Sequence, residues 1–236
     1  MRQLTPTSYA VLGLLAVRPR SAYELVTQIK RSNVRLIWPR AESKLYEEPK
    51  VLAAHGLAAE VRERSAARRA TVYRITPRGL RALRSWLDEP AHPLLLEFEG
   101  LLKVIFADFG SKQQLLANLR RIRDGAVQAA ALTVPLVREL AENPQFPERA
   151  HVTAIADRFL IDVLRATLDW AEWAEKVAEG WPATTLTPEM AHEARSILVE
   201  NARTVESIAA RQARSAAAPA RPRAARSARR SADARR

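Results

Sequence analysis

The hydrophobic pattern of this chain changes period at one point, and this change limits the folds open to it. Before residue 57 the apolar residues recur at three- and four-residue steps, as on helices. From Leu57 the period is two, with Leu57, Ala59 and Val61 on one face, and it is two again where Tyr73 and Ile75 alternate with their neighbours. The helical period then returns for the rest of the chain. The sequence predicts a mainly α protein with one β-hairpin.

Helix-capping signals set the boundaries around this hairpin. A capping residue followed by proline, or the Ser-x-x-Glu spacing, marks where a helix begins, and a glycine marks where one ends. Thr5-Pro6 marks the start of a first helix that ends near Pro19, and Ser21 with Glu24 marks the start of a second. A third helix follows Trp38-Pro39 and ends at Gly56. Thr76-Pro77 marks the start of a fourth helix after the hairpin.

The third helix has two faces. Leu45, Pro49 and Leu52 share one side at 100° per residue, whereas Ser43, Glu47 and Lys50 point the opposite way. The proline inside the helix is expected to bend it. Between the two strands, Ser65 to Ala70 is expected to form a polar connection.

The second half of the chain is predicted to be helical throughout. Candidate helices cover residues 95–109, 112–142, 149–177 and 188–211, with Pro135 expected to kink or split the second. The third carries an apolar stripe too long for a small domain to cover, which implies a partner helix. The stripe consists of Ile155, Phe159, Val163, Ala166, Trp170, Trp173 and Val177.

Charge is segregated along the chain. Residues 1–88 carry 17 Lys and Arg against 7 Asp and Glu, a net +10, whereas residues 89–213 carry 13 against 18, a net −5. Residues 214–236 carry 8 against 1, a net +7, and contain almost nothing to bury, so we expect them to be disordered. A basic front followed by an acidic middle is typical of a protein in which one module neutralises phosphates.

Several function classes are disfavoured. The chain has 0 cysteines, 7 glycines and four scattered histidines, and it lacks phosphate-binding loops, nucleophile elbows and zinc-ligand spacing. We therefore expect a protein that is not an enzyme and has no metal or other cofactor. We see neither a signal peptide nor a membrane span, and we expect a cytoplasmic, nucleoid-associated protein.

A three-helix core followed by a hairpin is the winged helix-turn-helix arrangement. At this point the chain resembles the PadR family of bacterial transcriptional regulators, in the branch with a helical, virulence-activator-like C-terminal region. The resemblance rests on SYAVLGLL at 8–15, SAYEL at 21–25, Leu45-Tyr46 with Leu52 and Gly56-Leu57, and VYRITPRGLRAL at 72–83, and it extends through 96–104 to about Trp181.

The resemblance implies a homodimer that regulates transcription, most often as a repressor, on a near-palindromic operator of double-stranded DNA. It also implies a possible small aromatic effector. The candidate DNA-binding residues are Tyr23, Arg40, Ser43, Lys44, Tyr46, Lys50, Arg64, Arg68 and Arg69. Phe159, Val163 and Trp170 are the candidate dimerisation residues, and Trp170 and Trp173 the candidate effector platform.

Plainer interpretations stay open for several of these residues. Tyr46 also fits an ordinary core aromatic, and Arg68 and Arg69 fit solvated turn residues. Glu42 and Glu47 could accept from cytosine, but pairing with Lys44 and Lys50 is the simpler expectation. An aromatic stripe such as that of the two tryptophans is usually core. A sequence-independent nucleic-acid-binding protein is the alternative function.

We expect four regions. Residues 1–90 form the winged helix-turn-helix domain, 91–182 a helical dimerisation and effector domain, 183–213 an extra helix and 214–236 the basic tail. The last two regions extend past the usual end of the family.

Overall fold

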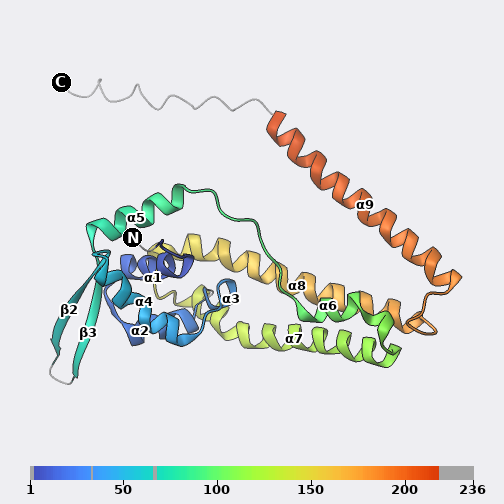
Figure 1. Cartoon of the computed structure of the whole chain (residues 1–236), viewed down its shortest axis with the longest axis horizontal. Helices are drawn as coiled ribbons and strands as arrows, with labels where there is room; N and C mark the ends of the chain where they lie inside the picture. The colour runs from blue at the N-terminus through green and yellow to red at the C-terminus, as the bar shows by residue number, and fades with distance from the viewer. Residues whose placement is uncertain (1–2, 33, 66–67, 218–236) are drawn as a thin grey trace. The chain divides into compact units, whose positions relative to one another are not determined.

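The computed structural model describes residues 3–32, 34–65 and 68–217 (Figure 1). The elements are α1 Pro6–Val17, β1 Arg20–Ser21, α2 Ala22–Lys30, α3 Val34–Ile37, α4 Glu42–Ala54, β2 Ala58–Ser65, β3 Arg68–Ile75, α5 Pro77–Asp88, α6 Glu99–Ile105, a 3-10 turn at Ala107–Phe109, α7 Lys112–Glu142, a second at Pro147–Arg149, α8 Ala150–Gly180 and α9 Pro188–Ala217. The predicted class, a winged helix-turn-helix followed by an all-α region, is confirmed.

The predicted caps are in place. The side chains of Thr5 and Ser21 each accept a hydrogen bond from the third backbone N–H of their helix, and their own backbone N–H donates to the side chain of that third residue, which closes a capping box. Thr76 caps α5 through the N–H of Gly79, at 3.0 Å. Gly56 has φ +69°, the left-handed conformation that ends α4 and favours glycine. Local sequence therefore sets the starts of α1, α2 and α5 and the end of α4.

The sheet has three antiparallel strands in the order β1-β3-β2. The hairpin is longer than predicted, because β2 and β3 pair as far as Ser65 with Arg68 and leave only residues 66–67 between them. The predicted alternation in β2 is wrong. Leu57 precedes the strand and Ala58 is buried, but Val61 is exposed because the hairpin extends beyond the core. The two-residue strand β1 was not predicted, and two residues are too few to show a period.

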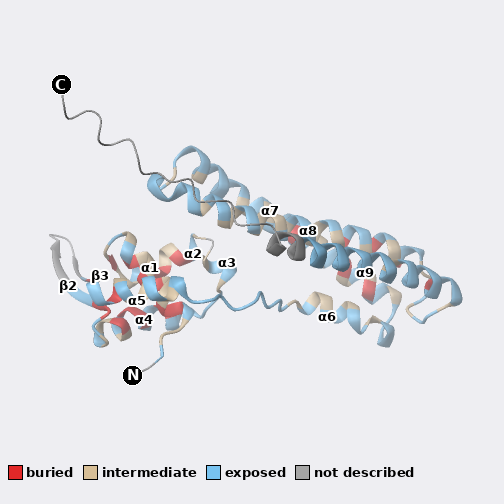
Figure 2. Ribbon diagram, turned by 90° about the horizontal axis from the view of Figure 1, so that it is seen from above, coloured by how far each residue is buried: buried red, intermediate tan, exposed pale blue. Residues whose placement is uncertain are grey.

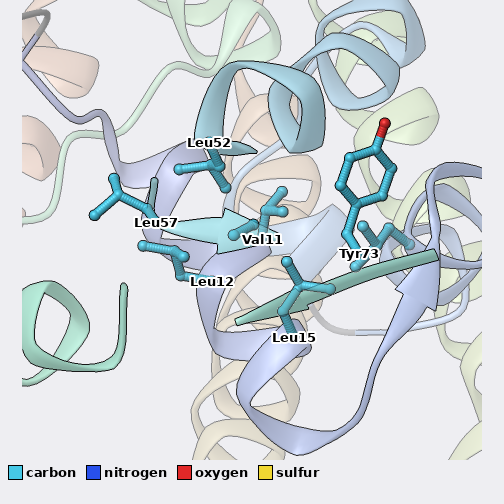
Figure 3. Packing of buried hydrophobic residues seen from close by; sticks show 8 residues of the cluster. Val11, Leu12, Leu15, Leu52, Leu57 and Tyr73 are labelled. Carbon is cyan, nitrogen blue, oxygen red and sulfur yellow. The ribbon is translucent and has the colours of Figure 1, made fainter. Parts of the chain in front are cut away.

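The core of this region forms where α1, α2 and α4 meet the base of the hairpin. Figure 3 shows Val11, Leu12 and Leu15 of α1 against Leu52 and Tyr73, with the rest of the cluster around them. A smaller cluster joins Val26 and Ile29 of α2 to Leu45 of α4. The rings of Tyr9 of α1 and Trp86 of α5 stack with centroids 4.7 Å apart, which packs α5 against α1.

The helical half agrees with its predicted boundaries at α7, α8 and α9. α7 runs unbroken through Pro135, so the proline does not split it, and α9 continues to Ala217. The helix predicted over 95–109 is wrong in extent: α6 begins at Glu99, and Leu94, Leu95 and Leu96 are exposed in the preceding segment. The spacing of the apolar residues in this segment resembles that of a helix, but these side chains are exposed and do not pack on a surface.

The chain divides into two compact units, residues 1–98 with 124–169 and residues 99–123 with 170–236. In the second unit, Leu115 and Leu119 of α7 pack with Ala178 of α8. Glu175 of α8 accepts from Arg120 at 2.6 Å and from Arg123 at 2.5 Å, which ties the same helices together. The four sequence regions predicted above remain a prediction. Among the described residues, no helix combines the length and apolarity needed to cross a membrane.

Candidate nucleic-acid interface

The outer face of α4 is the candidate interface. Ser43, Lys44, Glu47 and Lys50 are exposed, as the helical period predicts. The opposite face is buried and is made of Leu45, Glu48, Pro49 and Leu52. Pro49 is part of this buried face, and the helix continues through it from Glu42 to Ala54. The helix therefore presents hydroxyl, ammonium and carboxylate groups outward from a fixed apolar base.

A buried hydrogen bond helps to fix α4 against α1. The hydroxyl of Ser8 donates to the carboxylate of Glu48, with Oγ and Oε1 2.5 Å apart. Both residues are buried, where an unpaired carboxylate is costly, so this bond constrains the position of α4. Glu48 was not singled out from the sequence, although it lies at 100° per residue within the buried stripe, between Leu45 and Leu52.

The charged groups of α4 are partly paired. Lys44 lies 3.6 Å from Glu47, as predicted, but Glu42 pairs with Lys30 of α2 at 2.6 Å and not with a lysine of its own helix. This hydrogen bond to the Glu42 carboxylate raises the pKa of Lys30. Lys50 has no ion-pair partner in the described part of the chain. Its ammonium is therefore the one on this face that is most available to another molecule.

Three further candidates flank the helix. Arg40 stacks over the ring of Trp38 at 4.2 Å and donates to the carbonyl of Pro39 at 2.6 Å, so its guanidinium is held just before α4 begins. Tyr23, near the start of α2, is 69% exposed, and Tyr46 is 37% exposed. Tyr46 is therefore not a core aromatic, which leaves its phenol accessible.

The hairpin brings the candidate arginines of the wing together along the backbone. Arg64 of β2 is level with Arg69 of β3, and Arg68 is level with Ser65. Arg68 and Arg69 therefore belong to a strand and not to the predicted connection. The side chains of residues 62–70 lie outside the described residues, so the predicted phosphate contacts of these three arginines stay a prediction.

A buried arginine of the first unit was missed. Arg20 is 2% exposed, and its Nη1 donates to Gln28 Oε1 at 3.4 Å, while Nε and Nη2 have no hydrogen-bond partner among the residues that the structure describes. Arg18 and Arg20 both lie with the guanidinium carbon 5.7 Å from the centre of the Phe146 ring. Burial, followed by the neighbouring charge of Arg18, lowers the pKa of Arg20. Nothing in its local sequence distinguishes Arg20 from a solvated arginine.

The candidates on α8 separate into two groups. Phe159, Val163 and Trp173 are exposed on a single chain. Trp170 is half-buried and packs against the cluster of Leu115, Leu119 and Ala178. Exposed apolar side chains on Phe159 and Val163 agree with a face that another helix covers, whereas Trp170 already has partners within its own unit.

A segment in the middle of the chain matches a known family model. Residues 99–179 match the model for the virulence activator alpha C-terminal domain. No curated protein matches the sequence.

The fold is shared with solved bacterial regulators. The PadR-like transcriptional regulator BC1756 of Bacillus cereus is 14% identical, with a TM-score of 0.61 over 73% of this chain and 98% of that one. Bacillus subtilis PadR in complex with operator DNA is 21% identical, with a TM-score of 0.57 over 73% and 96%, and PadR was also solved with p-coumaric acid.

The virulence activator AphA of Vibrio cholerae is 19% identical, with a TM-score of 0.59 over 72% of this chain and 96% of that one. These matches confirm the predicted resemblance to the PadR-like branch.

Proposed function

We propose that this chain is a DNA-binding transcriptional regulator that inserts α4 into the major groove of an operator. The observation that carries this proposal is the outer face of α4, which presents Ser43, Lys44 and Lys50 on a helix anchored by the Ser8–Glu48 hydrogen bond. A major groove admits one helix, and hydroxyl and ammonium groups are among those that contact base edges and phosphates. The net charge of +10 in residues 1–88 supplies the attraction to phosphate.

The regulator acts as a homodimer on a near-palindromic site. Phe159 and Val163 of α8 are exposed and apolar, and a second copy would remove them from water. Two copies related by a two-fold axis present two α4 helices, which fits two half-sites one helical turn apart. Repression follows when the occupied operator overlaps a promoter, and we place the protein at the nucleoid in the cytoplasm.

A small aromatic effector would release the regulator from its operator. Support comes from the solved complex of PadR with p-coumaric acid and from the exposed Trp173, an aromatic surface on which a planar ligand could stack. Trp170 contributes through the packed cluster that it shares with α7.

Binding to the DNA upstream of its own gene and to random duplexes, measured by fluorescence anisotropy at physiological salt, tests the proposal. We expect affinity for the specific DNA to exceed that for random DNA by at least about 10³-fold. Lys50→Ala should weaken binding to the specific DNA by about 1–3 kcal/mol. Lys176→Ala, an exposed lysine of α8, is the matched control and should change nothing.

Equal affinity for both duplexes would support the alternative, a sequence-independent nucleic-acid-binding protein. The basic composition of residues 214–236 favours some contribution of this kind, because cationic side chains neutralise the phosphates of any duplex.

A further inference from the structure

Helix α9 is a part of the chain that the proposed function does not use. It spans Pro188–Ala217, 30 residues, and begins after the family match ends at residue 179. The solved relatives named above are covered over 96–100% of their own length but cover only 72–76% of this chain. This long helix therefore lies outside the segment that the family model matches, and we ask what it could bind.

Within the described residues, the contacts that anchor α9 to the rest of its unit lie at its start. Thr187 caps it through the N–H of Met190 at 3.3 Å, Met190 is buried, and the Trp181 indole N–H donates to Glu193 at 3.4 Å. Beyond this point Leu198, Val205 and Ile208 are 66%, 65% and 61% exposed, and Figure 2 colours α9 mostly as exposed over the part whose burial is described.

Six of the exposed apolar residues of α9 form a straight stripe. At 100° per residue, its members lie within about 80° of one another and follow three- and four-residue steps. They are Ala191, Ala194, Leu198, Ala202, Val205 and Ala209. Four alanines around two larger side chains allow two helix axes to approach to about 8 Å.

The charges beside this stripe are arranged asymmetrically. Arg195 and Glu206 lie on the same edge, about 20° apart around the helix axis. Both are exposed, and neither takes part in an ion pair or hydrogen bond within the described residues. The other edge is uncharged, with Asn201 and Ile208.

We propose that α9 pairs with α9 of a second copy of this chain, in antiparallel orientation. In an antiparallel pair related by a two-fold axis, each edge of the stripe meets the same edge of the other helix, so Arg195 faces Glu206 of the second copy twice. A parallel pair would bring opposite edges together and place both charges against the uncharged edge. Charge complementarity therefore selects the antiparallel pair.

The stripe also sets the register. With Leu198 level with Val205 of the second copy, Ala194 is level with Ala209, and the two-fold axis passes between residues 201 and 202. In this register Arg195 lies within about 3 Å along the axis of Glu206 from the second copy, at 1.5 Å per residue. Both the apolar and the ionic contacts are thus formed by one arrangement.

Single cysteines test the pairing directly, because the native chain has 0 cysteines. Ala202→Cys lies beside the two-fold axis, within the Cα separation that a disulfide needs, and should form a disulfide-linked dimer under mild oxidation. Ala191→Cys is about 30 Å from its own equivalent in this register and should not. Glu200→Cys, near the axis level but on the opposite face of the helix, is the matched control and should not cross-link either.

Charge reversal then tests the orientation. Arg195→Glu in the Ala202→Cys chain should lower the cross-linked fraction several-fold, and adding Glu206→Arg should restore it. Circular dichroism of each variant should show unchanged helix content, because all these positions are exposed.

Cross-linking of Ala202→Cys no stronger than that of Glu200→Cys would overturn the pairing. Equal cross-linking of Ala191→Cys and Ala202→Cys would indicate a parallel pair and overturn the orientation, as would a double reversal that fails to restore the cross-link. The readout is the α9 contact itself, so it is independent of the proposed DNA binding and of the α8 interface.

Discussion

Gly79 is the residue whose replacement should most clearly damage the winged domain. It lies in the first turn of α5, and a Cβ added there would stand 2.0 Å from the carbonyl oxygen of Leu57. That oxygen already accepts from the backbone N–H of Thr76 at 3.0 Å. The Thr76 hydroxyl, with one proton to donate, lies 3.1 Å from the same oxygen and 2.8 Å from the carbonyl oxygen of Gly56. The Leu57 carbonyl therefore cannot turn away without losing the backbone hydrogen bond, so α5 must move off the base of the hairpin.

We expect Gly79→Ala to lower the free energy of unfolding by about 2 kcal/mol. Overpacking costs about 1–3 kcal/mol and each hydrogen bond lost about 1 kcal/mol, whereas alanine gains about 1 kcal/mol from its higher helix propensity. For a chain of this size the midpoint of thermal unfolding should fall by about 4–8 °C. Differential scanning calorimetry measures it.

Gly13→Ala in α1 is the matched control, because a Cβ at Gly13 meets no atom within 4 Å. The same substitution should there stabilise the protein by up to about 1 kcal/mol and raise the midpoint. If Gly79→Ala melted at or above the wild-type temperature, the close approach of α5 to Leu57 would be refuted.

Three further predictions concern the proposed interfaces. The double substitution Arg68→Ala with Arg69→Ala should weaken binding to all duplexes by the same factor and flatten the slope of log K against log salt by about 1–2. An unchanged slope would refute the contact between the wing and the phosphates. Deletion of residues 214–236 should lower affinity for random DNA while sparing dimerisation and operator preference; a monomeric truncation in sedimentation would contradict this. Val163→Asp should disrupt the dimer, because it places an unpaired charge in an apolar interface, whereas Ala154→Asp on the opposite face of α8 should not. Sedimentation equilibrium distinguishes the monomer from the dimer. If the Val163→Asp variant dimerised as strongly as the wild type, the α8 interface would be refuted.

Much of the fold could be predicted from the sequence, because the signals that end helices are local. The Ser21–Glu24 capping box and the left-handed Gly56 each act within a few residues, and both are where the sequence predicts them. Periodicity likewise separated Ser43 from Leu45 on α4, since burial there follows one helical face.

What the sequence did not reveal depends on contacts between distant segments. The burial of Arg20 against Phe146 and of Glu48 against Ser8 joins residues far apart in the chain. Local patterns assign charged residues to the solvent by default. The overextended helix at 95–109 has the converse cause, since apolar spacing at Leu95 carries no information on whether a packing surface exists.

Selection of bound fragments from random DNA by the full-length protein, followed by sequencing, tests the central claim most directly. Two anchored α4 helices related by a two-fold axis should enrich one symmetric site with half-sites about 10 base pairs apart. Enrichment of no sequence, or of a single unrepeated half-site, would contradict the account.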